Sequence, residues 1–357
     1  MKNLVSIIFI LNSLIVTGQS NDKLMQEKMK ALDEYLEYAV VNSDFSGQVL
    51  VSSEHKKWID KGYGYADRAK KVKINEGTIF DIGDLSAQFT VAAILYLEQE
   101  GKLSVIDNIS KFFDVPKDKS GITLHHLITH TSGFKESLGG EFDLVTRMQM
   151  IKQAMESELL FTPGVRYSKS YIDYALLAAI IEIVSGKSFE DYLHENLFDK
   201  ASMDQTGFLL PKFSEKSIAI GYTGPYKWGR TSDHMFGTNG ASWYIKGSAG
   251  FLSNATDLYK WYDAVLSDEI LWQENVFRLF LPQVDIDAEG KHKFCYGWIT
   301  AHSEIGGASV ISEGNNKVFA GRLQIYLDSG VVIVLLTNAY NEKYEEIYEF
   351  IEQHAFN

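Results

Sequence analysis

Cysteine, proline and positive charge are all scarce in this 357-residue chain. Cys295 is the only cysteine, so no disulfide can form within one molecule, and we expect a buried hydrophobic side chain rather than a reactive thiol. Five prolines leave no obvious hinge or linker between domains. A net charge of −13 argues against nucleic acids and anionic membrane surfaces as partners, because both require basic patches.

The chain also lacks a stretch long enough to span a membrane. Its first apolar run, from Leu4 to Val16, is shorter than the about 20 residues that cross a bilayer. Lys2 precedes this run and the small residues Thr17 and Gly18 follow it, a pattern typical of a secretory signal peptide. We therefore predict a signal peptide over residues 1–18, a mature domain over residues 19–357 and no transmembrane anchor after signal removal. The mature protein is expected to be exported, to the periplasm or outside the cell.

Three common catalytic or metal-binding motifs are absent, namely G-x-S-x-G, H-E-x-x-H and C-x-x-C. The nine histidines show no metal-ligand spacing, and we expect neither a metal nor a cofactor.

Hydrophobic periodicity divides the chain into strands at both ends and helices in the middle. Strands are predicted over residues 45–52, 58–65, 295–300, 308–312, 318–327 and 331–337. Helices are predicted over residues 21–41, from about 84 to 101, over 171–185 and 254–266, and near the C-terminus. If the terminal strands share one antiparallel sheet, the fold class is α+β with an inserted, mostly helical lobe. The sheet part would cover about residues 22–80 and 290–357, and the helical part about residues 81–289.

Several segments resemble motifs of the serine β-lactamase and penicillin-binding-protein superfamily. Thr78–Thr90 is similar to the start of the family's active-site helix, and Ile122–Gly133 to its I-T-x-x-H-L-L-T-H-T-S-G segment. Phe161–Gly164 resembles its F-x-P-G turn, and Gly247–Ser253 its entry to a later helix. The resemblance covers nearly the whole mature chain and implies the β-lactamase/transpeptidase-like fold, with the sheet and helical lobe described above.

The resemblance also implies which positions should carry the family's chemistry. A serine and a lysine in S-x-x-K form the first cluster, Y-x-N or S-x-N the second, and K-T-G or H-x-G the third. In this chain the serine and lysine positions hold Asp84 and Ala87, and the second cluster falls on Lys169 and Tyr171. The third falls on Glu313, which Gly314 and Asn315 follow. No catalytic group is intact by this alignment, which predicts a pseudoenzyme.

Two interpretations of the substituted positions remain open. Asp84 could cap a helix N-terminus, where a carboxylate accepts from free backbone N–H groups. Alternatively, Asp84 faces Lys169 across the former pocket in a salt bridge, with Glu313 on a third wall. In that case Asp84, Lys169, Tyr171 and Glu313 would form a polar pocket that binds a ligand without cleaving it. A glycosidase with Asp84 and Glu313 as its carboxylates is weaker, because it depends only on their proximity.

Four aromatic residues belong to the stretch that borders the cleft in relatives: Tyr226, Trp228, Trp243 and Tyr244. They suit either sugar or peptide binding or, more simply, packing of the lobe. The leading functional hypothesis is binding of cell-wall fragments or another protein. Its alternatives are a divergent serine hydrolase (esterase, peptidase or β-lactamase-like) with an unidentified nucleophile, and a structural partner of an active paralogue. Ser86 is predicted to face away from the cleft, and Ser132 to stabilise a turn.

Overall fold

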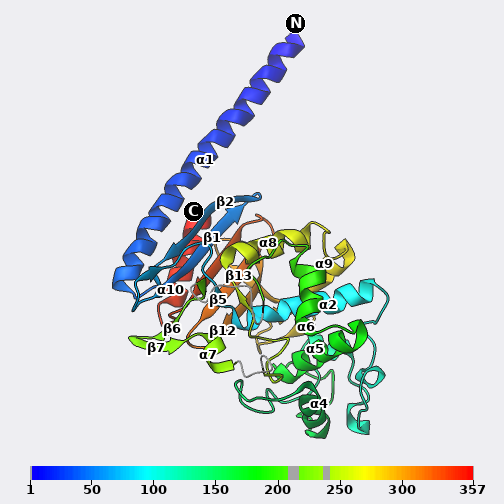
Figure 1. Ribbon diagram of the computed structural model, residues 1–357. Coiled ribbons are helices and arrows are strands. Elements are labelled where there is room, and N and C mark those ends of the chain that lie inside the picture. Colours follow the sequence, from blue (N-terminus) through cyan, green and yellow to red (C-terminus); the bar gives the residue numbers. More distant parts are fainter. Residues whose placement is uncertain (1, 208–216, 236–241, 357) are drawn as a thin grey trace.

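An eight-stranded antiparallel sheet joins the two ends of the chain, in the strand order β2-β1-β14-β13-β12-β11-β10-β9. The computed structural model describes residues 2–207, 217–235 and 242–356 (Figure 1). The N-terminal strand β1 pairs with the C-terminal strand β14, with Gly47 opposite Thr337. The strands are β1 Gly47–Ser53, β2 Lys56–Tyr63, β9 Val284–Asp285, β10 Lys293–Phe294, β11 Ile299–Ser303, β12 Gly307–Asn315, β13 Ala320–Tyr326 and β14 Val332–Thr337.

The central strand β14 is buried on both faces, which explains its unbroken apolar sequence. Val334 and Leu336 belong to the core beneath the helical lobe, whereas Ile333 and Leu335 belong to a second core on the opposite face. Because side chains alternate along a strand, one sheet separates two hydrophobic layers.

The second layer is formed by the two terminal helices, α1 Lys2–Asn42 and α10 Tyr344–Phe356. Their contact includes a stacked pair, Tyr35 and Phe350, with ring centroids 3.6 Å apart. The helix predicted over residues 21–41 is present, but α1 begins at Lys2 and its first half extends beyond the sheet in Figure 1. Among the described residues, no helix is long and apolar enough to cross a membrane.

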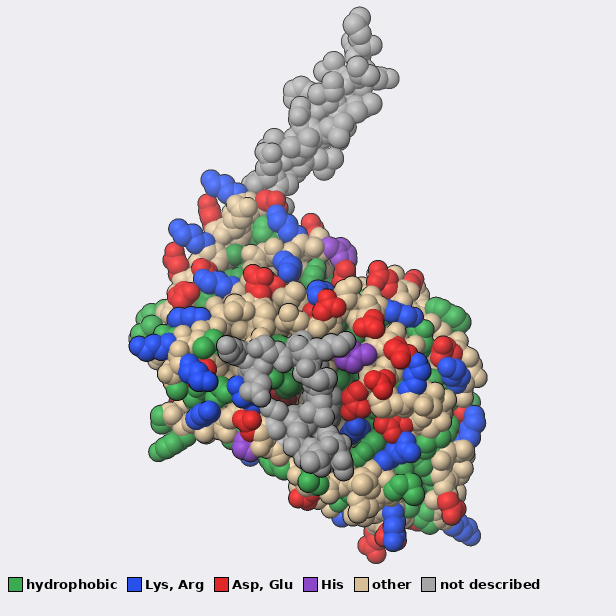
Figure 2. Space-filling view, in the orientation of Figure 1, with side chains coloured by type: hydrophobic (Ala, Val, Ile, Leu, Met, Phe, Trp, Pro, Cys, Tyr) green, Lys and Arg blue, Asp and Glu red, His purple; other side chains and the backbone are tan. Residues whose placement is uncertain are grey.

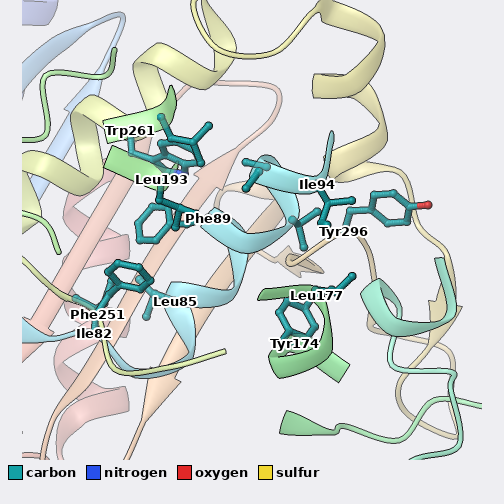
Figure 3. Close-up of a cluster of buried hydrophobic side chains, with 14 of the residues drawn as sticks. Ile82, Leu85, Phe89, Ile94, Tyr174, Leu177, Leu193, Phe251, Trp261 and Tyr296 are labelled. Carbon is teal, nitrogen blue, oxygen red and sulfur yellow. The ribbon is translucent and has the colours of Figure 1, made fainter. Parts of the chain in front are cut away.

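Helices cover the other face of the sheet. The helix α2 is buried on nearly all sides, since Phe89 contacts Phe198, Phe251 and Trp261 edge to face at centroid distances of 5.0, 5.7 and 5.0 Å (Figure 3). The helices of this lobe are α2 Ala87–Gln99, α3 Leu124–Ile128, α4 Arg147–Glu156, α5 Tyr171–Ser185, α6 Phe189–Leu193, α7 Thr231–Met235, α8 Ala255–Leu266 and α9 Gln273–Phe280. The predicted helices over residues 171–185 and 254–266 thus match α5 and α8 closely.

Short elements complete the lobe. Three two-stranded sheets pair β3 Tyr65–Asp67 with β4 Val72–Lys73, β5 Phe80–Asp81 with β8 Leu252–Ser253, and β6 Gly221–Thr223 with β7 Tyr226–Gly229. Short helical turns are η1 Gly83–Ser86, η2 Ile109–Lys111, η3 Lys117–Lys119 and η4 His194–Phe198. The predicted α+β class, with one antiparallel sheet from both chain ends, is confirmed.

One predicted strand is wrong. Residues 295–298 form a turn between β10 and β11, and only Ile299 and Thr300 belong to a strand, because Gly297 adopts a left-handed backbone with φ of 78°. Cys295 is fully buried within this turn, and burial raises the pKa of its thiol to about 12. A thiol held protonated is a poor nucleophile, which agrees with the expected structural role.

Candidate functional site

Two adjoining pockets, each of about 310 Å³, lie where η1 and the start of α5 meet strand β12. The first pocket is lined by all five residues that the sequence analysis aligned with the family motifs: Asp84, Ala87, Lys169, Tyr171 and Glu313. Asp84 and Tyr171 also line the second, together with Asp81 and Glu141. The structure therefore brings together the residues that the sequence predicts to share a pocket.

Asp84 reaches the pocket from η1, whose shape is set by its neighbours. The buried carboxylate of Asp81 accepts a hydrogen bond from the backbone N–H of Gly83 at 2.8 Å, and Gly83 has a φ of 52°. Ser86 turns inward, because its hydroxyl donates to the Gly83 carbonyl at 2.6 Å. Ser86 is fully buried, as predicted, and it is not among the residues that line either pocket.

Gly314 allows η1 to pack directly against strand β12. A Cβ atom on this residue would lie 2.4 Å from the backbone nitrogen of Asp84 and 2.6 Å from the carbonyl oxygen of Ile82. No side chain fits at those distances, so the one glycine retained in the third motif has a steric reason.

Lys169 is positioned by a segment that the loop over residues 130–136 holds on both sides. The backbone N–H of Ser168 donates to the carbonyl of His130 at 2.8 Å, and that of Tyr171 donates to the carbonyl of Glu136 at 2.8 Å. The hydroxyl of Ser170 donates to the carbonyl of Lys135 at 2.7 Å. The lysine therefore projects from a fixed backbone at the start of α5.

The ammonium group of Lys169 forms an ion pair with the carboxylate of Asp84 across the first pocket. Burial by itself would lower the pKa of Lys169, but the nearby Asp84 carboxylate raises it above the ordinary value. Solvent still reaches both partners, with 43% of the Lys169 side chain and 22% of Asp84 exposed. Asp84 lies in the first turn of η1, and neither η1 nor α2 has a side-chain hydrogen bond at its N-cap residue.

Two tyrosines flank this ion pair. The Lys169 ammonium lies 5.2 Å from the ring centroid of Tyr171. Tyr167, two residues earlier, also lines the pocket, and burial raises the pKa of its hydroxyl to about 12. Both phenols therefore stay protonated at neutral pH and can donate hydrogen bonds to a ligand.

A buried polar network lies directly behind Lys169. Asp173 contacts the Nδ1 atom of His130 at 2.9 Å and accepts a hydrogen bond from the Ser132 hydroxyl at 2.5 Å. Burial lowers the pKa of His130 to about 3 and raises the pKa of Asp173 well above its ordinary value. The backbone N–H of Ser170 also donates to His130 Nδ1, at 3.3 Å, so this nitrogen is an acceptor. Burial thus favours the neutral form of both groups.

Glu313 lines the pocket from strand β12, whereas Asp84 reaches it from the helical turn η1. Its register partner on β13 is Arg322, which binds both Glu313, at 2.8 Å, and Glu345 of α10, at 3.1 Å. The guanidinium carbon of Arg322 lies 4.4 Å from the ring centroid of Tyr348. The neighbouring Ser312 instead accepts from Gln88 of α2 at 3.2 Å. Glu313, Arg322, Tyr344 and Glu345 all line this pocket, and together they form what we call the Glu313 cluster.

Two serines line the first pocket, Ser248 and Ser312, and both are almost fully buried. The Ser248 hydroxyl donates to the backbone carbonyl of Ile245 at 2.8 Å, and Ser312 bonds to Gln88. Among the described residues, no histidine or lysine side chain forms a hydrogen bond with either hydroxyl, so neither has the adjacent base that an activated serine needs.

The four aromatic residues proposed for the cleft border do not line either pocket. The hydroxyl of Tyr244 donates to Gln153 at 2.5 Å, and Trp228 and Trp243 pack against the core of the lobe. Tyr226 is 77% exposed on β7. Packing of the lobe therefore explains Trp228, Trp243 and Tyr244 better than ligand binding does.

Charge is distributed without a broad basic patch on the face that Figure 2 shows, where acidic and basic side chains are interspersed. Within the described ranges, no three His, Cys, Asp or Glu side chains are arranged to hold a metal ion. The pocket itself combines three acidic and two basic side chains: Asp84, Glu313, Glu345, Lys169 and Arg322.

Sequence reasoning missed several polar residues of the pocket, among them His130, Tyr167, Arg322, Tyr344 and Glu345. His130 had been assigned to a structural segment, and it has a left-handed backbone with φ of 55° beside the pocket. Tyr167 could have been found, because it lies two residues before Lys169 on the same segment. Arg322 could have been found only from the strand register that places it opposite Glu313.

Comparison with known proteins gives consistent results. The sequence model of the family described as beta-lactamase matches residues 22–356. The chain is 29% identical over 268 residues to PbpX of Bacillus subtilis (strain 168), covering 73% of this chain and 65% of PbpX. It is 25% identical over 332 residues to penicillin-binding protein 4* of the same strain, covering 88% of this chain and 73% of that protein.

The solved structures include a penicillin-binding protein homologue from Pyrococcus abyssi, described as octameric. It superimposes with a TM-score of 0.78 at 23% identity, covering 92% of this chain and 78% of that one. At this identity the similarity establishes the fold, and the fold agrees with the family match.

Proposed function

The chain belongs to the β-lactamase family, and from the state of its pocket we propose that it is a catalytically inactive member that binds a ligand or another protein. Binding without turnover requires a formed pocket and the loss of the groups that attack a carbonyl. The pocket of about 310 Å³ supports the first requirement, and the charged pair that occupies it supports the second.

The Asp84–Lys169 ion pair carries the proposal. By the family resemblance, Asp84 occupies the position of the attacking serine and Ala87 that of the lysine one helical turn later. A carboxylate paired with an ammonium group is not a nucleophile for acyl transfer, and alanine cannot accept a proton. Removing catalytic groups singly costs several orders of magnitude in a serine protease, so replacing them together supports an inactive pocket.

The residual serines do not supply a substitute. Ser248 and Ser312 are bonded to a backbone carbonyl and to an amide side chain respectively. Neither geometry would increase the nucleophilicity of a hydroxyl. This weakens the alternative of a divergent serine hydrolase.

The proposal specifies the ligand only by broad class. Cell-wall fragments are suggested because a relative, penicillin-binding protein 4*, is named for binding penicillin. Another protein is the second possibility, through the same cleft or the outer surface. A structural partner of an active paralogue would bind independently of the pocket, and substitution of pocket residues distinguishes the two.

Acylation is the decisive test. The protein should be incubated with a fluorophosphonate and, separately, with a penicillin, and its intact mass recorded together with a thermal melt that shows it to be folded. We expect no added mass. An adduct that maps to one serine, and that Ser248→Ala or Ser312→Ala abolishes, would refute the proposal and identify the nucleophile.

Export is the second part of the proposal. The N-terminal pattern over residues 1–18 predicts that a cell with a general secretion pathway removes this segment. Expression with a C-terminal tag, fractionation and N-terminal sequencing should find the protein outside the cytoplasm, beginning near residue 19. An intact Lys2 in the cytoplasmic fraction alone would contradict it.

A further inference from the structure

We propose that the Glu313 cluster is a subsite for a primary ammonium group on the ligand. This inference deepens the proposed binding function and depends on it. It starts from a hydroxyl group: the Tyr344 side chain lines the pocket and is only 7% exposed, yet its hydroxyl has no hydrogen-bond partner among the described residues. A buried hydroxyl without a partner is unfavourable, and ligand binding would satisfy it.

The charges around this hydroxyl select the ligand. Arg322 donates to Glu313 through Nε and Nη2, at 3.1 and 2.8 Å, and both bonds end on the same oxygen, Oε2. The second oxygen of Glu313 has no hydrogen bond among the described residues. Arg322 also binds both oxygens of Glu345. One guanidinium therefore faces two carboxylates, which leaves the cluster with an excess of negative charge.

Arg322 is not available to an anionic ligand. Four of its five N–H donors are directed at Glu313 and Glu345. The Asp84–Lys169 pair is likewise balanced. A carboxylate or phosphate would have to break one of these pairs, whereas an ammonium group could donate to the free Glu313 oxygen and to the Tyr344 hydroxyl with both pairs intact.

The location suits one part of a longer ligand. Gly314, Ala320 and Gly321 line the pocket between the cluster and the Asp84–Lys169 pair. These residues lie at the adjoining ends of β12 and β13 and present little side-chain bulk, so the ligand would lie across them and place its amine beside Glu313 and Tyr344.

Three small probes test the assignment: Nα-acetyl-lysine N-methylamide, its norleucine analogue, which lacks the ammonium group, and its glutamate analogue. Titration followed by ligand-observed NMR at low salt should show binding of the lysine probe, with the norleucine and glutamate probes at least about tenfold weaker. Binding should weaken as salt is added, because the Glu313 side chain is partly exposed.

Two variants and a control sharpen the test. Glu313→Gln keeps the shape and an oxygen acceptor for Arg322, and it should weaken the lysine probe about tenfold. Tyr344→Phe should also weaken the probe, while its Tm stays within about 2 °C of the wild type, since the hydroxyl has no bond to lose. Glu346→Gln is the matched control, because Glu346 directly follows Glu345 on α10 and pairs with Lys343 outside the pocket.

The proposal is overturned if the lysine probe does not bind up to about 20 mM, or if norleucine binds as well. It is also overturned if Glu346→Gln weakens binding as much as Glu313→Gln does. These outcomes leave the absence of acylation untouched. An acylated serine would instead refute the inactive-pocket proposal, whatever the probes show, so the two failures can be told apart.

Discussion

Two polar groups lie side by side at the start of α5, and they differ in how far water reaches them. Asp173 and His130 are 0% and 7% exposed in their side chains, whereas Asp84 and Lys169 are 22% and 43% exposed. Burial favours the neutral forms of His130 and Asp173, which are joined by a hydrogen bond, whereas the Asp84 carboxylate favours the charged form of Lys169. Both are acid–base pairs at hydrogen-bonding distance.

The difference indicates separate roles. Breaking a buried polar network costs much free energy of unfolding, because any group that loses its partner has no water to replace it. A solvated ion pair contributes little to stability, because screening and side-chain entropy oppose the attraction. We therefore assign fold stability to the His130–Asp173–Ser132 network and recognition to the Asp84–Lys169 pair.

The strongest test of this comparison is Asp173→Ala. It leaves His130 and Ser132 without their buried partner, and we expect a loss of about 3 kcal/mol in the free energy of unfolding. Asp173→Asn should cost only about 1 kcal/mol, because its amide can donate to His130 and accept from Ser132. Urea denaturation measures both. Equal losses for the two variants would contradict the neutral arrangement.

Asp81 allows a test by pH, since it is a buried carboxyl next to the exposed pair. Burial raises its pKa from about 3.8 to about 6, despite hydrogen bonds from Thr231 and Gly83. The folded state then holds its proton over a range in which the unfolded state has lost it. The contribution of Asp81 to stability therefore falls as pH rises from about 3.8 to 6, by about 1.4 kcal/mol per pH unit and about 3 kcal/mol in total.

Asp81→Asn cannot titrate. Its stability relative to wild type should rise by about 3 kcal/mol between pH 3.8 and 6 and stay constant above that range. Urea denaturation of both proteins at several pH values gives the difference, in which the other titrating groups cancel. A difference independent of pH would show that Asp81 is ionised throughout.

The smallest effect is expected for the exposed pair. Lys169→Met, Asp84→Asn and the double variant form a cycle whose coupling free energy should be below about 1 kcal/mol and should shrink in salt. Thermal or urea denaturation at low and high ionic strength measures it. A coupling well above about 2 kcal/mol would assign the pair to fold stability and remove the contrast with the buried network.

The sequence predicted much of this site because family motifs locate backbone positions. The offset from Pro163 and Gly164 was enough to place Lys169 opposite Asp84. It could not supply the side-chain environment of Glu313, because the predicted strand ended at residue 312 and β12 continues to Asn315. The facing partner Arg322 follows from strand register, and Glu345 from the docking of α10, which are both tertiary facts.

The fold was predictable for a similar reason, and the errors in its prediction are local. Long periodic segments such as α5 and α8 gave their bounds directly. The turn at Gly297 was missed because aromatic and apolar residues surround the glycine and mimic a strand. The start of α1 was missed because residues 2–20 have the composition of a signal peptide, which sequence reasoning set apart from the fold.

The pairing of β1 with β14 has a consequence for biosynthesis. Gly47 to Ser52 align with Thr337 to Val332, so a strand made early must wait for nearly the whole chain to be synthesised. Until then Val49 and Leu50, both fully buried in the finished sheet, have no neighbour on that side. The sheet therefore cannot be completed before residues 332–337 have been synthesised. Any stop codon before Val332 would leave β1 as an open, apolar edge that favours aggregation.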